Sequence, residues 1–268
     1  MRPVLTIAIV AGCYAPTIPE GVPCATNLAC PGGLTCLGGR CVAHPSDAAP
    51  ACTPIVAGPG ALTAPAVSTL VLDGDLADWP TCFVTLDRHT AIIRDLKGVG
   101  DYSIGRFSVA HDATRLYIAA EVTGVPPLGD QPLPAIYDND SISVYLDGDG
   151  MFATQAYDAD GLQIVVDHAN RAQAFHGSAI ATANLTTATR TTGATFTIEM
   201  AVSPTTLAVP AFASTIGFDI GFESGDGAVQ TSELVWFEKC GPPMCGCAGG
   251  TSAPFCDARE LGTLTLAP

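Results

Sequence analysis

The chain is poor in basic residues, and this scarcity narrows the range of its partners. Lys and Arg total 11 against 26 Asp and Glu in 268 residues, which gives a formal net charge of −15. A surface with this balance repels phosphate backbones and anionic headgroups, so nucleic acid is excluded as a partner and polyanionic glycans are disfavoured. Neutral polysaccharides, divalent cations and basic protein patches remain compatible with it.

Two further patterns are missing. No stretch after the N-terminus approaches the roughly 18 consecutive apolar residues that a membrane helix needs, although 48% of the chain is hydrophobic. Helical periodicity of useful length is also absent, apart from one turn at 203–207, where Ser203 would cap and Pro204 would take the first helical position. The chain is therefore predicted to be all-β, and attachment to a membrane is expected only through its N-terminus.

The first twelve residues have the pattern of a cleaved export signal. Arg2 supplies a positive charge, residues 4–10 form an apolar core, and residues 10–12 are small or compact side chains directly before Cys13. This order is similar to the lipobox of bacterial lipoproteins, in which the cysteine is acylated and becomes the mature N-terminus. The similarity implies an exported protein anchored by lipid at Cys13, and Tyr14 in place of Asp implies the outer membrane or cell surface. An ordinary secretory signal is the alternative.

The cysteines predict disulfides in an oxidising compartment. The chain has 11 cysteines, and once Cys13 is assigned to lipid an even number remains for pairing. One group predicts a small stapled domain at residues 13–43, and a second group is expected to close on itself in a Gly/Pro-rich loop. Cys52 and Cys82 are then left for each other. Zinc is the competing interpretation of the first group, but neither its spacing nor the exported location fits. The two groups are Cys24, Cys30, Cys36 and Cys41, and Cys240, Cys245, Cys247 and Cys256.

Residues 66–268 carry the main folding pattern. Residues 44–65, rich in Ala, Pro, Ser and Gly, are predicted to be a linker. Beyond them, apolar and polar residues alternate, which predicts β-strands with one buried face. Gly, Asp, Asn and Pro clusters separate these segments, and many short strands with frequent turns are typical of a β-sandwich. We therefore predict an all-β, two-sheet antiparallel β-sandwich, jelly-roll-like, after the disulfide-rich segment. The alternating segments are 116–122, 141–147, 162–166, 196–202 and 216–222.

An ordered set of motifs runs through the predicted sandwich. DGDLADW at 73–79 is followed by Asp112 with RLYIAA at 115–120, by DSISVYLD at 140–147, by FTIEMAV at 196–202 and by IGFDI at 216–220. This set resembles the family 9 carbohydrate-binding modules, β-sandwiches related to DOMON-like domains that occur beside glycan-degrading enzymes and on bacterial surfaces. The resemblance implies a non-catalytic domain that binds a neutral oligosaccharide or polysaccharide.

The resemblance also implies a site. In that family two aromatic rings hold a terminal sugar, and polar side chains bind its hydroxyls. The first ring corresponds to Tyr137, the glutamate position to Ser143, the glutamine position to Gln163 and the arginine position to Val165, while Phe255 is the aromatic available where the second ring would lie. A carbohydrate site at Tyr137, Ser143, Gln163 and Phe255 is therefore expected. The alternative for Tyr137 is that it shields the edge of the strand it precedes.

Acidic turns form the other cluster of interest. Calcium takes about six to eight oxygen ligands, so four carboxylates on two turns are compatible with a structural calcium site. Plain turn residues are the alternative, because Asp-Gly is a common hairpin pair. No other cofactor is expected. The acids show no spacing that singles out a catalytic pair, so hydrolysis of O-glycosyl bonds is expected only from a partner enzyme. The four residues are Asp147, Asp149, Asp158 and Asp160.

Two functional hypotheses follow. In the first, a lipid-anchored surface protein binds carbohydrate and supports polysaccharide capture or carbohydrate catabolism. In the second, the protein is a disulfide-stapled adhesion or scaffold module of the cell envelope that has lost sugar binding and contacts other envelope proteins. Three departures from the family favour the second hypothesis: Ser143 and Val165 replace charged sugar-binding side chains, and the second tryptophan is lost. A glycan array separates the two, because a protein-contact module should bind no sugar.

Overall fold

The structure, a computed structural model, describes part of the chain. The described residues are 35–37, 40–42, 52–86, 92–95, 104–123, 129–150, 157, 159–175, 185–226, 228–237 and 258–268. The chain divides into two compact units, Met1–Ala51 and Cys52–Pro268. In the first unit a short hairpin of β1 (Thr35–Leu37) and β2 (Arg40–Val42) pairs Cys36 with Cys41 in backbone register. The expected signal segment and Cys13 lie outside the described residues.

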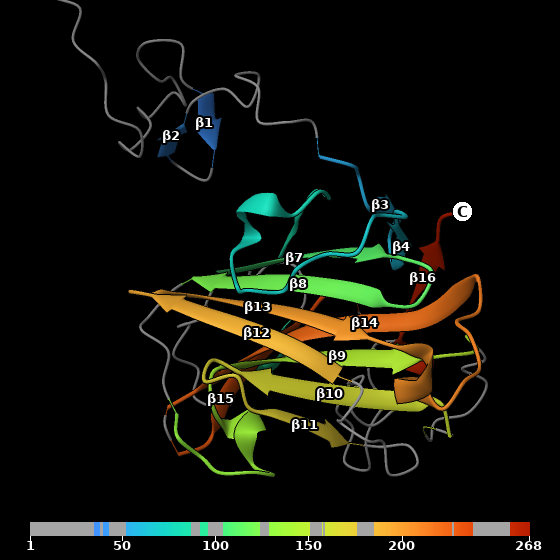
Figure 1. Cartoon of the computed structure of the whole chain (residues 1–268). Helices are drawn as coiled ribbons and strands as arrows, with labels where there is room; N and C mark the ends of the chain where they lie inside the picture. Colours follow the sequence, from blue (N-terminus) through green and yellow to red (C-terminus); the bar gives the residue numbers. More distant parts are fainter. Residues whose placement is uncertain are drawn as a thin grey trace, which may run out of the picture. The chain divides into compact units, whose positions relative to one another are not determined.

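The second unit is built from two sheets, which confirms the predicted β-sandwich (Figure 1). The smaller sheet has five strands in the order β12-β13-β8-β7-β5. The larger has the order β11-β10-β9-β14-β16-β4-β3, with β15 between β14 and β6. Among the described strands of this unit, neighbours pair antiparallel except β16 with β4. The smaller sheet comprises β5 (Val84–Leu86), β7 (Ile104–His111), β8 (Leu116–Thr123), β12 (Leu185–Thr192) and β13 (Thr195–Val202).

Strand β14 organises the larger sheet. One edge of β14 pairs with β9, and its other edge pairs first with β16 and then with β15. Residues from β9, β14 and β15 therefore share one surface, although these strands are far apart in sequence. The larger sheet comprises β3 (Val56–Gly58), β4 (Ala61–Ala64), β6 (Ile92–Asp95), β9 (Ser141–Asp147), β10 (Gly161–Asp167), β11 (Ala172–Phe175), β14 (Thr215–Gly225), β15 (Gln230–Val235) and β16 (Gly262–Leu266).

The prediction that residues 44–65 form a linker was wrong for residues 56–64. Strands β3 and β4 belong to the sandwich, and β4 pairs in parallel with β16 near the end of the chain. Leu62 and Ala64 are fully buried in the core. This segment is too short and too rich in Gly and Pro for its alternation to stand out, so the pairing with β16 is what makes it a strand.

The core lies between the sheets and follows the predicted alternation. Inward-facing residues of both sheets form one buried cluster, and Phe107 on β7 meets Phe218 on β14 with ring centroids 6.0 Å apart. Burial of each such side chain stabilises the fold by about 1.5–3 kcal/mol. The inward residues of β9, Ile142, Val144 and Leu146, are completely buried. The opposite residues of the same strand consequently face outward.

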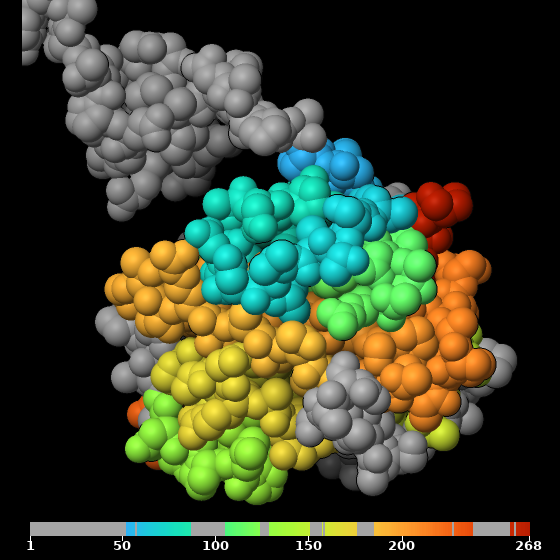
Figure 2. All heavy atoms as spheres, in the orientation of Figure 1, coloured from blue at the N-terminus to red at the C-terminus, as the bar shows by residue number. Residues whose placement is uncertain are grey.

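The smaller sheet also carries a buried outer layer. Trp79 and Tyr117 pack there with the segment 67–83, which Figure 2 shows in cyan across the outside of the sandwich. Glu199 on β13 holds the start of this segment, because its carboxylate accepts the backbone N–H groups of Asp73 at 2.8 Å and Gly74 at 2.6 Å. Gly74 has a φ of +80°, a conformation that other residues rarely adopt. The DGDLADW motif is thus part of the framework.

One predicted disulfide is present. Cys52 and Cys82 are bonded, with sulfurs 2.08 Å apart and a sequence separation of 30 residues. Closing a loop of this length stabilises a fold by about 3–4 kcal/mol. The pairing confirms the prediction for these two cysteines. Cys24, Cys30, Cys240, Cys245, Cys247 and Cys256 lie outside the described residues, and for Cys36 and Cys41 only the backbone is described.

Short 3-10 turns complete the fold. The turn predicted near Ser203 is present as η5 (Pro204–Leu207), but the Ser203 hydroxyl bonds to Thr205 and Thr206 instead of capping the backbone. Three others are η2 (Leu76–Asp78), η3 (Ile136–Asp138) and η6 (Ala258–Glu260). Within the described part of the chain, none of the helices has the length and hydrophobicity to span a membrane.

Candidate functional site

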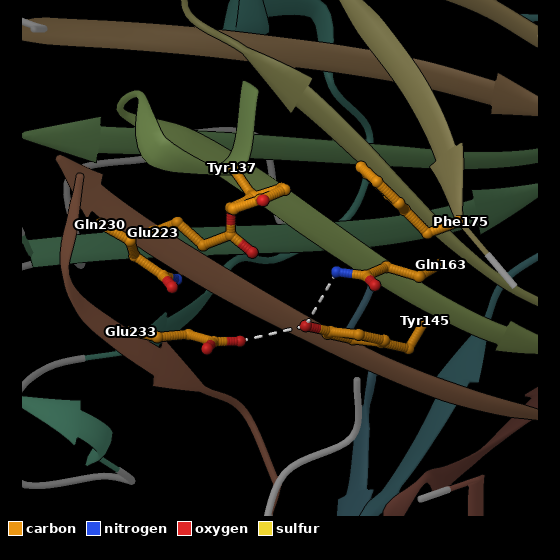
Figure 3. A pocket seen from close by; sticks show the side chains of 7 residues that line it. All are labelled: Tyr137, Tyr145, Gln163, Phe175, Glu223, Gln230 and Glu233. Atoms are coloured by element: carbon orange, nitrogen blue, oxygen red, sulfur yellow. Dashed lines mark hydrogen bonds between the residues drawn. The ribbon is translucent and has the colours of Figure 1, made fainter. Parts of the chain in front are cut away.

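A pocket opens on the outer face of the larger sheet, the face turned away from the core. Its volume is about 220 Å³. That is below the roughly 300–1,000 Å³ typical of pockets for drug-sized ligands, so it has room for about one sugar ring. Figure 3 shows the pocket, with the polar ends of several side chains pointing toward one another. The lining residues are Tyr137, Tyr145, Gln163, Phe175, Glu223, Gln230 and Glu233.

Strand alternation explains why polar groups gather here. On a strand, successive side chains point to opposite faces, so the outward residues of β9 are Ser141, Ser143 and Tyr145. Register then places Ser141 beside Glu223 of β14, and Glu223 beside Glu233 of β15. Both glutamates are almost fully buried, with exposed fractions of 4% and 1%. A sheet face that would otherwise meet solvent thus carries two enclosed carboxylates.

Hydrogen bonds join these groups into a polar floor, which we define as Ser143, Tyr145, Gln163, Glu223 and Glu233. The Tyr145 hydroxyl donates to Glu233 Oε1 at 3.0 Å, and the Ser143 hydroxyl donates to Glu223. The Gln163 amide Nε2 donates to the Ser143 oxygen at 3.1 Å and to the Tyr145 oxygen at 3.3 Å. The network links β9, β10, β14 and β15, so the floor is held rigidly by the sheet.

Tyr145 is kept protonated in this network. Burial raises the pKa of Tyr145 well above its usual range, and the nearby Glu233 and Glu223 charges raise it further. The phenol therefore stays a hydrogen-bond donor at all physiological pH values. The Tyr145 hydroxyl donates this hydrogen bond to Glu233 Oε1.

An aromatic wall, formed by Tyr137 and Phe175, borders the floor. Tyr137 lies on η3 and is 39% exposed, whereas Phe175 ends β11. Their ring centroids are 5.8 Å apart and the planes meet at 65°. Aromatic faces bind the apolar side of a sugar ring, but two rings in direct contact leave no space for a sugar between them. The wall therefore offers one stacking surface rather than a clamp.

Backbone contacts hold η3 beside the pocket. The Asp138 carboxylate accepts the N–H of Gln230 at 2.9 Å, and the Asp140 carboxylate accepts the N–H of Gly225 at 2.9 Å. These bonds tie the segment that carries Tyr137 to the β14–β15 hairpin. Because Gln230 lines the same pocket, one set of contacts positions both sides of its mouth.

A buried network fixes the same segment to β10. Asn139 is fully buried, and its side chain donates to Asp167 at 3.1 Å while its oxygen accepts the backbone N–H of Gln131 at 2.9 Å. Asp167 is also paired with Arg171 at 2.6 Å. A buried carboxylate satisfied by an arginine and an amide is a rigid support. Tyr137 therefore stands on a loop that is anchored at several points.

The structure brings three of the four predicted sugar-binding residues together. Tyr137 and Gln163 line the pocket, and Ser143 lies in the floor beneath them, where it contacts Gln163 and Glu223. Phe255 lies outside the described residues. Their role in binding sugar stays a prediction, but their common location matches it.

The two glutamates were not among the predicted site residues. Ser143 stands at the position that corresponds to a glutamate of the family, yet Glu223 on the neighbouring strand provides a carboxylate and accepts the Ser143 hydroxyl. Gln230, Tyr145 and Phe175 were missed as well. A signal was present, because Glu223 and Glu233 are out of phase with the apolar residues of their strands. That phase places them on the outer face but does not reveal that the two strands are neighbours.

Three of the four acidic turn residues lie close together. Asp147, Asp149 and Asp160 each offer an oxygen, and these oxygens lie within 4.8 Å of one another. Asp147 also accepts the N–H of Gly150 at 2.8 Å, as a turn residue does. Asp158 lies outside the described residues. The cluster has the donor chemistry of a calcium site, and calcium binding stays a prediction.

Comparison with known proteins identifies the family of the chain. Residues 88–267 match the family described as carbohydrate family 9 binding domain-like, which covers most of the chain. The chain belongs to this family. The match spans the pocket and all but two of the strands of the larger sheet, β3 and β4. A search among curated proteins found no match.

Solved structures of family 9 modules share the fold. Two structures of a family 9 carbohydrate-binding module from Caldicellulosiruptor kristjanssonii, in complex with cellotriose and with glucose, have TM-scores of 0.55 and 0.56 and are both 17% identical. Each covers 77% of this chain, and the chain covers 93% and 95% of theirs. At 17% identity the similarity shows a shared fold and nothing further.

Proposed function

We propose that this family 9 domain binds carbohydrate, with the sugar resting on the polar floor against the aromatic wall. The observation that carries the proposal is the combination of buried hydrogen-bonding side chains with exposed Tyr137 in one small pocket. Sugar recognition uses these two features, because a pyranose has one apolar face and a rim of hydroxyls. Family membership supports the proposal, as do the cellotriose and glucose complexes of the similar modules.

Binding without catalysis fits the position of the carboxylates. Glycosidases place two carboxyl groups on opposite sides of the bond that they cleave. Glu223 and Glu233 instead project from adjacent strands of one sheet and lie side by side in the floor. They are arranged to accept hydrogen bonds from one face of a ligand. Any hydrolysis of the bound glycan is then the work of a separate enzyme.

The proposal includes a place for the protein in the cell. Lipid at Cys13 would anchor it to the outer membrane or cell surface, where glycan capture would support carbohydrate catabolism. The support is the signal-like segment before Cys13 and the even number of remaining cysteines. Metabolic labelling with palmitate tests the anchor: the full chain should incorporate label and Cys13→Ser should not. Label in both would contradict lipidation at Cys13.

The alternative, a scaffold module without sugar binding, has less support. Its sequence argument was the loss of the glutamate at Ser143, of the arginine at Val165 and of the second tryptophan. Glu223 answers the first of these losses, because it supplies a carboxylate beside Ser143 in the pocket. A glycan array with the chain from Tyr14 to Pro268 distinguishes the two functions. We expect retention of at least one neutral glycan. Retention of none would contradict the proposed function and leave the scaffold role.

A further inference from the structure

A groove lies on the outer face of the smaller sheet, the sheet that does not carry the pocket. Its volume is about 460 Å³, roughly twice the volume of the pocket and within the range of about 300–1,000 Å³ that is typical of ligand sites. Residues 74–77 of the DGDLADW motif form one wall, and side chains from β7, β8, β12 and β13 form the floor.

Strand register aligns the polar side chains of this floor. Arg190 on β12 lies opposite Thr197 on β13, and Thr197 lies opposite Glu121 on β8. Glu121 in turn lies opposite Arg106 on β7. Directly opposite residues project from the same face of a sheet. Arg190, Thr197, Glu121 and Arg106 therefore form one polar row across four strands.

The wall is fixed to the sheet beside this row. The completely buried Glu199 carboxylate accepts the backbone N–H of Gly74 at 2.6 Å, and the Thr197 hydroxyl donates to the Gly74 carbonyl. Arg190 donates to Asp75 at 2.9 Å. Figure 2 shows the cyan segment that contains the wall beside the gold atoms of β12. Because each of these contacts lies within the protein, the groove is formed before a ligand arrives.

The charges of the groove are balanced. Arg106 pairs with Glu121 at 2.7 Å, and Arg190 pairs with Asp75 at 2.9 Å. Two positive groups thus lie next to two negative ones, and the field of each is largely cancelled by its partner. The groove favours neither an anion nor a cation, and a neutral polar ligand fits it best.

The paired groups keep hydrogen-bonding capacity. A guanidinium has five N–H donors, of which Arg106 uses Nε and Nη2 on Glu121 and Arg190 uses Nη1 on Asp75. Among the described residues, Nη1 of Arg106 and Nε and Nη2 of Arg190 have no hydrogen-bond partner. A carboxylate has about four lone-pair sites, so Glu121 and Asp75 can accept further bonds. Donors and acceptors side by side match hydroxyl groups, which are both.

Apolar groups border the polar row. Leu76 and Ala77 line the wall, and Thr192 and Thr195, which are opposite each other on β12 and β13, add methyl groups to the floor. A pyranose ring has an apolar face and a rim of hydroxyls. The groove therefore offers a surface for each part of a sugar.

We infer that this groove is a second carbohydrate site, which binds about two rings of a neutral oligosaccharide. The inference goes beyond the proposed function, which concerns the pocket alone. Pocket and groove lie on the outer faces of different sheets, so one short oligosaccharide cannot occupy both. The protein holds two glycan chains, or two parts of one polysaccharide, and linked sites raise the apparent affinity for an immobilised polysaccharide.

Nuclear magnetic resonance on the chain from Tyr14 to Pro268 tests the second site. The Nε–H signals of Arg106 and Arg190, assigned with the Arg106→Lys and Arg190→Lys variants, report on the groove. The neutral probes are the trimers of β-1,4-linked glucose, xylose and mannose and of α-1,4-linked glucose, with any neutral glycan that the array retains. The trimer of α-1,4-linked galacturonate is the anionic comparison. We expect at least one neutral probe to shift both signals saturably, and the galacturonate trimer to shift neither.

Variants locate the binding. Arg106→Ala, followed through the Arg190 signal, should weaken binding in the groove about tenfold, the effect of losing one hydrogen bond to a charged group. Exposed ion pairs contribute little to stability, so this variant should fold. Arg115→Ala is the matched control, because Arg115 is an exposed arginine that does not line the groove, and it should leave the affinity unchanged. Tyr137→Ala changes the pocket and should also leave the response of the groove unchanged.

The outcomes separate this inference from the proposed function. Unshifted arginine signals with every neutral probe would overturn the inference, as would an equal response to the galacturonate trimer or equal weakening by Arg106→Ala and Arg115→Ala. Loss of the groove response in Tyr137→Ala would also overturn it, because a single site would then explain both. Array retention with a silent groove leaves the proposed function intact. A groove response with no effect of Tyr137→Ala on array retention supports the groove and contradicts the pocket.

Discussion

The Tyr145 hydroxyl donates to Glu233 across an intervening strand. Tyr145 lies on β9 and Glu233 on β15, with β14 between them, and the oxygens are 3.0 Å apart. Gly221 on β14 makes this contact feasible, since a Cβ atom at this position would lie 3.3 Å from Glu233 Oε1. The absence of a side chain on β14 thus allows two strands that are not neighbours to share one hydrogen-bonded floor.

Removing the Tyr145 hydroxyl should affect both stability and binding. Tyr145→Phe deprives buried Glu233 of a donor and Gln163 of an acceptor, so we expect a loss of about 1–3 kcal/mol in the free energy of unfolding and weaker sugar binding. Urea unfolding and calorimetry measure the two effects. Tyr117→Phe is the matched control, because Tyr117 donates to Asp112 at 2.6 Å on the other sheet. The control should lose stability but keep sugar affinity, and equal losses of affinity in both variants would contradict a role of the floor.

The aromatic wall should contribute to sugar affinity. Tyr137→Ala removes the exposed stacking surface, and we expect affinity to fall about three- to tenfold, in line with about 0.5–1.5 kcal/mol for an aromatic contact. Affinity electrophoresis against the best array glycan measures it. Val71→Ala is the control, because Val71 is a more exposed apolar residue on the segment that covers the other sheet. Unchanged retention of Tyr137→Ala would show that Tyr137 only shields the strand edge. For Phe255→Ala we also predict weaker retention.

Asp219 should make the protein less stable as pH rises. It is fully buried on β14, one of its oxygens has no hydrogen-bond partner, and burial raises its pKa well above the usual range. An acid that is harder to ionise in the folded state takes stability away once pH exceeds its unfolded pKa, near 3.8. Asp219→Asn removes this penalty while keeping an oxygen for the N–H of Ile220.

Thermal unfolding from pH 4 to pH 8 checks this expectation. Asp219→Asn should gain stability relative to the parent chain at pH 8, and the gain should shrink toward pH 4, because the ionised fraction of the unfolded carboxyl falls as pH approaches its unfolded pKa of 3.8. If the difference in stability between Asp219→Asn and the parent chain were the same at every pH, ionisation of the buried Asp219 could not be its cause.

Asp112 should act in the opposite direction at low pH. Burial raises its pKa, but hydrogen bonds from Tyr117, Thr114 and Arg115 outweigh burial and lower the pKa to about 2. A carboxyl with a depressed pKa stabilises the fold above its unfolded pKa of 3.8 and loses that contribution as pH falls toward 2. The free energy of unfolding should therefore decrease less steeply from pH 4 to pH 2 in Asp112→Asn than in the parent chain. The same slope in variant and parent would contradict the assignment.

Calcium gives a further test of the acidic turns. A site at Asp147, Asp149 and Asp160 predicts that calcium raises the melting temperature and that a chelator reverses the rise, because a ligand at 100 times its dissociation constant stabilises a fold by about 2.7 kcal/mol. Asp160→Asn should reduce the effect. An unchanged melting temperature across calcium and chelator would identify these residues as plain turn residues.

More of the fold than of the candidate site could be predicted from the sequence. Alternation in the sequence was enough to identify β8, β9, β10, β13 and β14 and their buried faces, because a strand exposes successive side chains to opposite sides. Cysteine parity, together with the grouping of eight other cysteines into two clusters, was enough to predict the bond between Cys52 and Cys82. The role of residues 56–64 was missed, since their partner, β16, comes about two hundred residues later in the chain.

The sequence alone determined the class of fold, the core residues of the alternating strands and the acidic surface, since these depend on composition and on periodicity within single strands. Only the tertiary structure decided the chemistry of the pocket. Glu223 and Glu233 meet Tyr145 because β14 pairs with β9 on one edge and with β15 on the other. Pairing between distant strands depends on backbone hydrogen bonds that every residue can make, so local sequence does not specify it.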